Sequence, residues 1–256
     1  MSGLILRLAG PLQSWGERSA FSPTRDTAPF PTRSALTGLF AAAEGITRDD
    51  AGALNRYQPL RFTVRVDRPG TPLVDYHTVG GGLPKARTAA TSGGSHKGAA
   101  VVTRRHYLAD AVFVVAVCGP PEITTPIARA LRHPHWAPYL GRRACVPDEP
   151  FVLRSHAEDP EAELLTRVPV SRSVPRGTAA TLTVNFLREE PPSVQGTRID
   201  ALDVYDMPLS FSPRGRVHGR RTLYRTLEEI PAALAGPKDI PLMQRLIDYA
   251  RTEEPA

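Results

Sequence analysis

Lysine, cysteine and methionine are scarce in this 256-residue chain. The two cysteines, Cys118 and Cys145, lie far apart and have no further pair of ligands beside them, so neither a disulfide framework nor a zinc site is expected. No apolar run approaches the ~18 residues of a membrane span, and the first residues lead into a short apolar stretch without a basic leader. We therefore expect a cytoplasmic protein without a membrane segment.

Sequence motifs for catalysis and cofactor binding are also missing. No glycine-rich nucleotide loop, metal-ligand cluster or nucleophilic triad occurs at a recognised spacing, so we expect no cofactor, no metal and no small-molecule substrate. One enzymatic alternative stays open, the metal-independent cleavage of RNA, which needs only a base and an acid. Suitable side chains are present in Tyr76, His77, Lys97, His106 and Tyr107.

The positive charge is carried almost entirely by arginine. The chain has 32 Lys+Arg against 26 Asp+Glu, a formal net charge of +6, and Lys85, Lys97 and Lys238 are its only lysines. Because the planar guanidinium group favours bidentate phosphate contacts and stacking on bases, this surplus suits a polyanionic partner. A genome rich in G and C would produce the same arginine bias, and this alternative stays open.

Residues 31–45 have the pattern of a complete helix. The apolar positions repeat with helical spacing at Leu36, Leu39, Phe40 and Ala43. Thr32 or Ser34 can cap the N-terminus, and Gly45 can end the helix. Because free N–H groups at a helix start attract anions, we expect this end, together with Arg33, to bind a phosphate. In the alternative interpretation, Arg33 only solvates the helix start.

The remaining apolar patterns predict an α+β fold. Residues 3–10 and 112–118 have the nearly continuous apolar character of buried strands, and residues 60–66 alternate with a period of two. Three polar residues of the alternating strand are expected to face solvent, with a ligand as the alternative: Arg61, Thr63 and Arg65. A second helix is expected to begin with Thr125 as its N-cap and to stop at Pro134. This order of elements fits a ferredoxin-like or RRM-like sheet.

A basic, glycine-rich insertion interrupts the predicted sheet at about residues 77–107. It has too few apolar residues to build a core of its own, whereas its two flanks have strand character. Long loops inside compact domains are usually functional or disordered. We predict a projecting β-hairpin with a basic tip, called the thumb below; the alternative is a solvated disordered loop.

The chain is expected to divide into three parts. Residues 1–147 would form an RRM-like RNA-binding domain that carries the thumb, residues 148–225 a smaller C-terminal β region, and residues 226–256 a helical tail. Within the β region, residues 181–187 and 203–209 read as strands that pair antiparallel.

Several separated segments resemble one protein family. Residues 4–16, followed by Thr24-Arg25, residues 30–34 and Gly38-Leu39, form the first match, and residues 75–79 and 139–147 form the others. In this order and spacing they resemble the CasD-type subunits of the type I-E CRISPR Cascade complex, which belong to the RAMP superfamily. The resemblance covers about residues 3–225.

The resemblance implies a non-catalytic, RNA-binding subunit of an antiviral surveillance complex. Such a subunit would cap the 5′ handle of the guide RNA and join the backbone filament subunit to the large subunit. Target DNA would be recognised indirectly, through base pairing with the guide. Two alternatives remain, an endoribonuclease that processes CRISPR precursor RNA and a free-standing RRM-like RNA-binding protein, although the aromatic RNP pattern of the latter is missing.

The resemblance also selects candidate RNA-binding residues. In this hypothesis cations contact phosphates and aromatic rings stack on bases. One wall would consist of Arg7, Gln13, Ser14, Trp15, Arg25, Thr32, Arg33 and Ser34. A second wall would consist of Tyr139, Arg142 and Arg143, and the thumb would add His77, Lys97, Arg104 and Arg105. An ordinary turn with surface arginines remains the alternative for residues 139–143.

Overall fold

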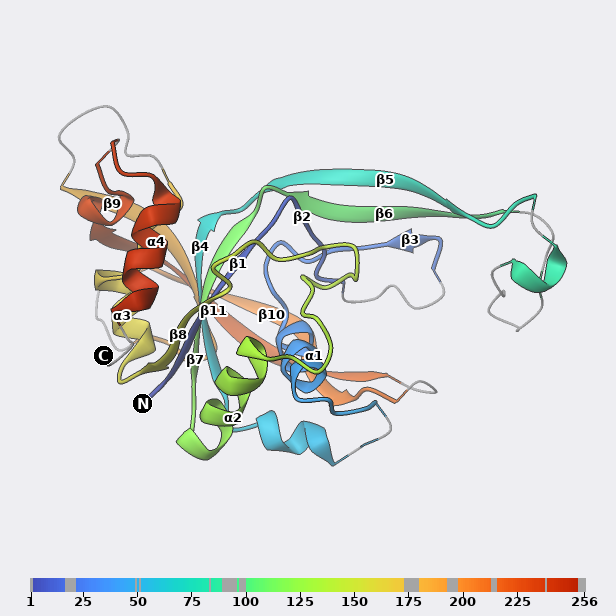
Figure 1. Cartoon of the computed structure of the whole chain (residues 1–256), viewed down its shortest axis with the longest axis horizontal. Helices are drawn as coiled ribbons and strands as arrows, with labels where there is room; N and C mark the ends of the chain where they lie inside the picture. The colour runs from blue at the N-terminus through green and yellow to red at the C-terminus, as the bar shows by residue number, and fades with distance from the viewer. Residues whose placement is uncertain are drawn as a thin grey trace.

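The computed structural model describes residues 2–16, 22–48, 50, 52–82, 84–88, 96, 100–172, 180–192, 198–212, 216–237 and 239–252. Within these residues the chain forms a seven-stranded sheet, a smaller sheet of four strands and four α-helices (Figure 1). The strands are β1 (Gly3–Ala9), β2 (Leu12–Gln13), β3 (Thr24–Arg25), β4 (Arg61–Arg68), β5 (Thr71–Val79), β6 (Val101–Ala109), β7 (Val112–Cys118), β8 (Val152–Ala157), β9 (Thr181–Arg188), β10 (Ile199–Ser210) and β11 (Val217–Pro231). The helices are α1 (Arg33–Ala43), α2 (Pro121–Arg132), α3 (Pro160–Thr166) and α4 (Leu242–Arg251), with short 3₁₀ turns η1 (Ala53–Tyr57), η2 (Lys85–Arg87) and η3 (Ala232–Ala235).

The centre of the large sheet has the ferredoxin-like topology. Its strand order is β10-β11-β9-β4-β7-β1-β8, and β1, β4, β7 and β8 form the core unit with α1 after β1 and α2 after β7. The pairings of β1 with β7 and β8, and of β4 with β7, are all antiparallel. The predicted ferredoxin-like or RRM-like sheet is therefore confirmed.

The C-terminal strands extend this same sheet beyond β4. β9 pairs with β4, β11 pairs with β9, and β10 forms the outer edge. The expected pairing of residues 181–187 with 203–209 is wrong, because β11 lies between the two strands. The domain boundaries at residues 147 and 225 stay predictions, although β8, which completes the core unit, begins only at Val152.

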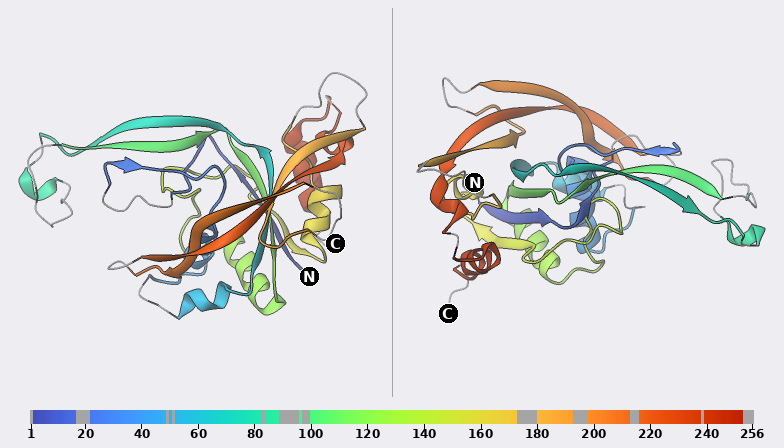
Figure 2. Two further views of the ribbon diagram at one scale, coloured as in Figure 1. Left: turned by 180° about the vertical axis from the view of Figure 1, so that it is seen from behind. Right: turned by 90° about the horizontal axis from the view of Figure 1, so that it is seen from above.

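Helices cover both faces of the large sheet (Figures 1 and 2). On one face, Leu6 of β1 belongs to a core with Phe40 of α1 and Ile127 of α2. On the other face, Ile5 shares a core with Leu164 of α3 and Leu246 of α4. Because neighbouring residues of a strand point to opposite sides, β1 contributes to both cores and is buried along its whole length.

The predicted helices form, but one begins earlier than expected. α1 is capped by Thr32 and followed by Gly45, which has a positive φ of 74°, as predicted. α2 begins at Pro121 instead of after Thr125, because Pro121 can occupy the first turn without losing a hydrogen bond, and Pro126 lies inside the helix. In the tail, α4 forms as expected, whereas β11 continues to Pro231.

The expectation that Arg65 and Thr63 face solvent is wrong, because α3 covers that side of β4. The Arg65 side chain is completely buried and pairs with Asp67 at 2.7 Å. Its remaining N–H groups donate to main-chain carbonyls, including that of Leu164 at 2.6 Å.

Among the helices that the structure describes, none is long and apolar enough to cross a membrane.

The thumb leaves the large sheet as an antiparallel hairpin of β5 and β6 (Figures 1 and 2). The register runs from Thr71 opposite Ala109 to Val79 opposite Val101. Both faces of β5 are largely exposed, in contrast to the buried strands of the large sheet. The predicted hairpin is confirmed and begins at Thr71, a few residues earlier than expected.

Candidate RNA-binding interface

The base of the thumb carries a cluster of arginines that the sequence separates widely. β6 is flanked by β2 in antiparallel and by β3 in parallel pairing. This register places Thr24 beside Arg104 and Arg25 beside Arg105, and the Arg104 N–H donates to the carbonyl of Pro23 at 2.8 Å. We call Arg25, Arg104 and Arg105 the thumb-base arginines.

The thumb-base arginines keep charge available for a ligand. Arg104 is exposed, and Arg25 and Arg105 are half-buried. Arg105 Nε donates to the Thr103 hydroxyl at 3.1 Å, a neutral partner. Asp75 lies opposite Arg105 but accepts from His77 at 3.1 Å. As far as the described residues go, none of the three arginines forms an ion pair, so an incoming phosphate would not have to displace a carboxylate.

Arg142 holds this cluster in place. Its own guanidinium group is engaged by contacts within the chain and is not available to a ligand in the same way. Its guanidinium carbon lies 4.6 Å from the centre of the Tyr107 ring, and its Nη2 donates to the carbonyls of Arg25 at 3.1 Å and Asp26 at 3.4 Å. These contacts fasten the turn at residues 139–145 to β3. The next residue, Arg143, is exposed.

Gly141 lets the turn approach the main chain of Ser14. Its φ is +85°, and a Cβ there would lie 1.7 Å from the Ser14 carbonyl oxygen. We predict that Gly141→Ala lowers the free energy of unfolding, measured by urea denaturation, by about 3 kcal/mol through backbone strain and this clash. Gly82→Ala is the control, because Gly82 has a φ of +69° but nothing within 4 Å, and should lose only about 1 kcal/mol. Equal losses would contradict the proposed clash.

Gln13, Ser14 and Trp15 are buried, so their predicted contact with RNA is wrong in this structure. The Gln13 amide donates to the carbonyls of Leu8 at 3.0 Å and Ala111 at 2.8 Å. The Ser14 hydroxyl donates to the His106 carbonyl at 2.9 Å. The Trp15 ring is 1% exposed and cannot stack on a base. These residues hold β2 beneath the base of the thumb.

The start of α1 is not an open anion site, and the prediction for it is wrong. The Thr32 hydroxyl accepts from Ala35 N at 3.3 Å, and Asp206 accepts from Arg33 N at 2.7 Å. The Arg33 guanidinium is 4% exposed and binds both carboxylate oxygens of Glu189 at 2.8 and 2.7 Å. The carboxylates of the protein itself occupy the place that was expected for phosphate.

Arg221 completes this buried network. It pairs with Asp206 at 2.5 Å and with Glu189 at 2.7 Å, so two carboxylates are shared with Arg33. The network joins α1 to the residue that follows β9 and to β10 and β11. Ser34 is half-buried, with its hydroxyl 3.4 Å from that of Thr32.

Arg7 is also buried. It is 5% exposed on the face of β1 opposite Leu6, and burial lowers the pKa of its guanidinium. Its Nε and Nη1 are buried and have no hydrogen-bond partner among the described residues.

Three candidate RNA-binding residues remain. Tyr139 and His77 are half-buried, and Lys97 lies outside the described residues.

The two thumb histidines lie on opposite faces of the hairpin. His77 is aligned with Thr103, whereas His106 is aligned with Val74. Residues directly opposite each other share a face, so Arg105 lies on the face of His77 and Arg104 on the face of His106. This arrangement does not place the two imidazoles on one phosphate as base and acid.

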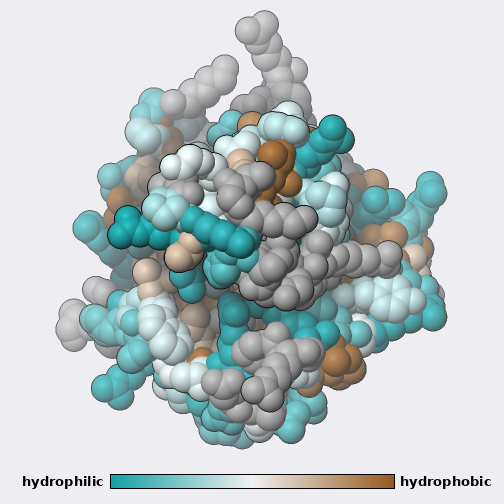
Figure 3. All heavy atoms as spheres, turned by 90° about the vertical axis from the view of Figure 1, so that its right-hand side faces the viewer, coloured by the Kyte–Doolittle hydropathy of each residue, from teal (hydrophilic) through white to brown (hydrophobic). Residues whose placement is uncertain are grey.

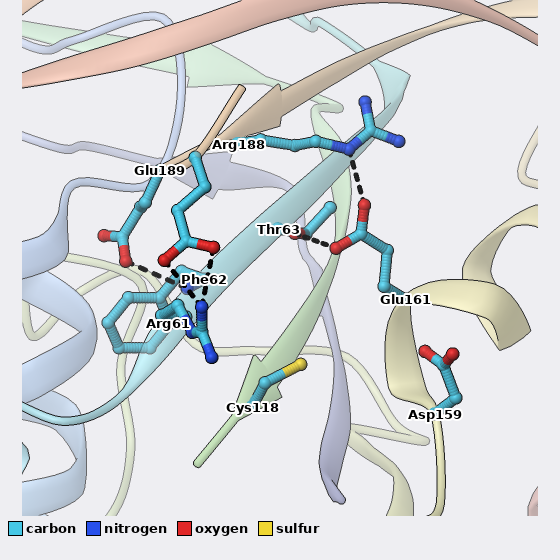
Figure 4. Close-up of a pocket in the computed structure, with 9 residues that line it drawn as sticks. Arg61, Phe62, Thr63, Cys118, Asp159, Glu161, Arg188 and Glu189 are labelled. Carbon is cyan, nitrogen blue, oxygen red and sulfur yellow. Dashed lines mark hydrogen bonds and ion pairs between the residues drawn. The ribbon is translucent and has the colours of Figure 1, made fainter. Parts of the chain in front are cut away.

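A cavity of about 190 Å³ lies away from the thumb, between β4, β7, β9 and the start of α3 (Figure 4). It is lined by Arg61, Phe62, Thr63, Cys118, Asp159, Glu161, Arg188, Glu189 and Glu190. Carboxylates outnumber the guanidinium groups, which are paired with Glu190 and Glu161. Burial, followed by the charge of Glu161, raises the pKa of Cys118 to about 11. No metal-binding group of His, Cys, Asp or Glu was found among the described residues. Because carboxylates dominate its lining, the cavity is unsuited to RNA.

One exposed aromatic side chain was considered from the sequence only as a candidate for RNA cleavage and not as an RNA-binding residue. Tyr76 of β5 is 68% exposed and lies directly opposite Arg104. The alternation along residues 71–79 could have indicated that Tyr76 and His77 point to different faces. Figure 3, which faces the side from which the thumb projects, shows a mainly hydrophilic surface with separate hydrophobic patches.

Comparisons with known proteins agree with one another. The family model described as CRISPR-associated protein (Cas_Cas5) matches residues 3–224. "CRISPR system Cascade subunit CasD" of Escherichia coli (strain K12) is 41% identical over 186 residues, which cover 68% of this chain and 80% of the relative. A chain of a solved "CRISPR RNA-guided surveillance complex" has a TM-score of 0.85 and 48% identity, with 97% of this chain and 99% of that chain covered. A "Crystal structure of Cas protein" has a TM-score of 0.58 and 30% identity, with coverages of 91% and 97%.

Proposed function

This chain belongs to the CRISPR-associated Cas5 family, and from this premise we propose that it is the Cascade subunit that binds the 5′ handle of the guide RNA. The relatives at 41% and 48% identity, one named as a Cascade subunit and one from an RNA-guided surveillance complex, support this proposal. The guide RNA and other Cascade subunits are its partners in the cytoplasm. It joins the backbone filament to the large subunit, and target DNA is read by the guide.

The observation that carries the proposal is the register between β3 and β6. It aligns Arg25 with Arg105 on one face of a projecting hairpin and leaves Arg104 on the other, and none of the three forms an ion pair within the described residues. A single RNA strand bound there would place its phosphates on these cations and release the counterions. The buried arginines such as Arg33 serve the fold, so the interface depends on far fewer cations than the sequence contains.

The role is one of binding without cleavage. Cutting RNA without a metal would require a base and an acid aligned on one phosphate. His77 and His106 lie on opposite faces of the thumb, which disfavours that chemistry. The chain therefore holds the handle and leaves the phosphodiester bonds intact.

The experiment compares two guide RNAs of equal length in complexes reconstituted without divalent metal. One guide carries the intact 5′ handle and the other a scrambled handle. We expect retention of the first alone, at unchanged length. Equal retention of both would overturn the handle assignment. Discrete cleavage products that disappear in His77→Ala or His106→Ala would overturn the non-catalytic role.

A further inference from the structure

One face of the thumb, which we call the Tyr76 face, has side chains suited to an unpaired base. We restrict it to the part beyond Pro72 and the buried Leu108, which lie on the same side nearer the large sheet, and this part holds six residues, three from each strand. They are Val74, Tyr76 and Thr78 of β5 and Val102, Arg104 and His106 of β6.

The apolar side chains of the Tyr76 face do not serve a core. Tyr76 is 68% exposed, Val74 55% and Val102 38%. On the opposite face of the same hairpin, Tyr107 is only 6% exposed and packs beneath Arg142. The hairpin therefore has its buried aromatic ring on one face and presents a second ring to solvent on the other, where it belongs to neither hydrophobic core of the described residues.

The charge of the Tyr76 face selects a polyanion. None of its six residues is acidic, whereas the opposite face contains Asp75. Arg104 lies directly across from Tyr76, and side chains in this relation are about 5 Å apart at Cβ. A ring beside an unpaired guanidinium matches a nucleotide, whose base stacks on the ring while its phosphate meets the cation.

We propose that Tyr76 stacks on one unpaired base of the handle and that Arg104 binds the phosphate beside it. This inference rests on the proposed function and assigns a base contact to a residue outside the arginine cluster. Stacking on an aromatic ring is tolerant of sequence, because every base has a π face. The contact would fix the position of the strand on the thumb without reading its sequence.

The test uses reconstituted complexes that contain guide RNAs with one 5-iodouridine each, placed at successive handle positions. Irradiation should cross-link one position to the peptide that contains Tyr76. The cross-link should persist in Tyr76→Phe, which keeps the ring, and disappear in Tyr76→Ala. Affinity for the guide should fall about tenfold in Tyr76→Ala, as expected for the loss of one stacked base. Tyr205→Ala, at a 48% exposed tyrosine of β10, is the control and should change neither quantity.

Two outcomes would overturn the inference. One is handle-dependent retention of the guide with no cross-link to Tyr76 at any position, which would leave the proposed function intact. The other is unchanged RNA affinity in Tyr76→Ala with loss of a neighbouring subunit from the complex, which would assign this face to a protein contact. Loss of handle dependence in the wild-type complex would instead refute the proposed function itself.

Discussion

Arg33→Ala should lower the free energy of unfolding by about 3 kcal/mol, because it leaves part of a buried charge network without its partner. Glu189 is 12% exposed and binds Arg33 through both carboxylate oxygens. Arg221 remains in place and offsets part of the loss. Chemical denaturation of the whole chain measures the effect.

Arg61→Ala is the matched control for this substitution. Arg61 pairs at 2.6 Å with Glu190, the residue after Glu189, but the side chains of Arg61 and Glu190 are 35% and 64% exposed. Exposed pairs contribute little, so the expected loss is below about 1 kcal/mol. If Arg33→Ala were as mild as Arg61→Ala and instead weakened RNA binding, the structural role assigned to Arg33 would be wrong.

The second large effect is expected at the thumb. Removing all three thumb-base arginines in Arg25→Ala, Arg104→Ala and Arg105→Ala should weaken guide binding by about 100-fold at ~0.1 M salt. The estimate assumes one phosphate contact per arginine. The fold should persist, because the described contacts of these side chains include no buried ion pair. Filter binding of the reconstituted complex gives the affinity.

A control for this variant removes the same charge elsewhere. Arg129 and Arg132 lie on α2 and Arg167 directly follows α3; all three are exposed and lie away from the thumb. Replacing these three with alanine should change the affinity by less than about threefold. An equal loss in both triple variants would mean that net charge, and not the thumb, binds the RNA.

Local sequence patterns were sufficient for the centre of the fold. β1 and β7 were found from continuous apolar runs, and α1 from helical spacing between Thr32 and Gly45. Each of these signals lies within a few residues of the element it predicts. The resulting order of elements then limits the topology to a few sheets.

The roles of individual arginines could not be predicted, because their partners lie far along the chain. Asp206 and Glu189 are separated from Arg33 by 173 and 156 residues. Arg220 and Arg225 likewise pair with Asp203 and Asp200 across β10 and β11. Periodicity within a strand gives no information about such cross-strand partners.

The spatial arrangement of the interface could not be predicted, for a related reason. β3 has only two residues, too few for a pattern, and its pairing with β6 is what aligns Arg25 with Arg105. Trp15, an aromatic residue near arginines, resembled a base-stacking contact until its burial was known. Sequence could therefore indicate RNA binding but could not separate contacts from supporting residues.

The salt dependence of guide binding tests the central claim most directly. For single-stranded RNA the slope of log K against log salt changes by about 0.7 for each phosphate contact. The variant without the thumb-base arginines should therefore show a slope smaller by about 2 than the wild type, and the control triple variant on α2 and α3 should keep the wild-type slope. Identical slopes for the wild type and the thumb variant would contradict the assignment of these arginines to the RNA.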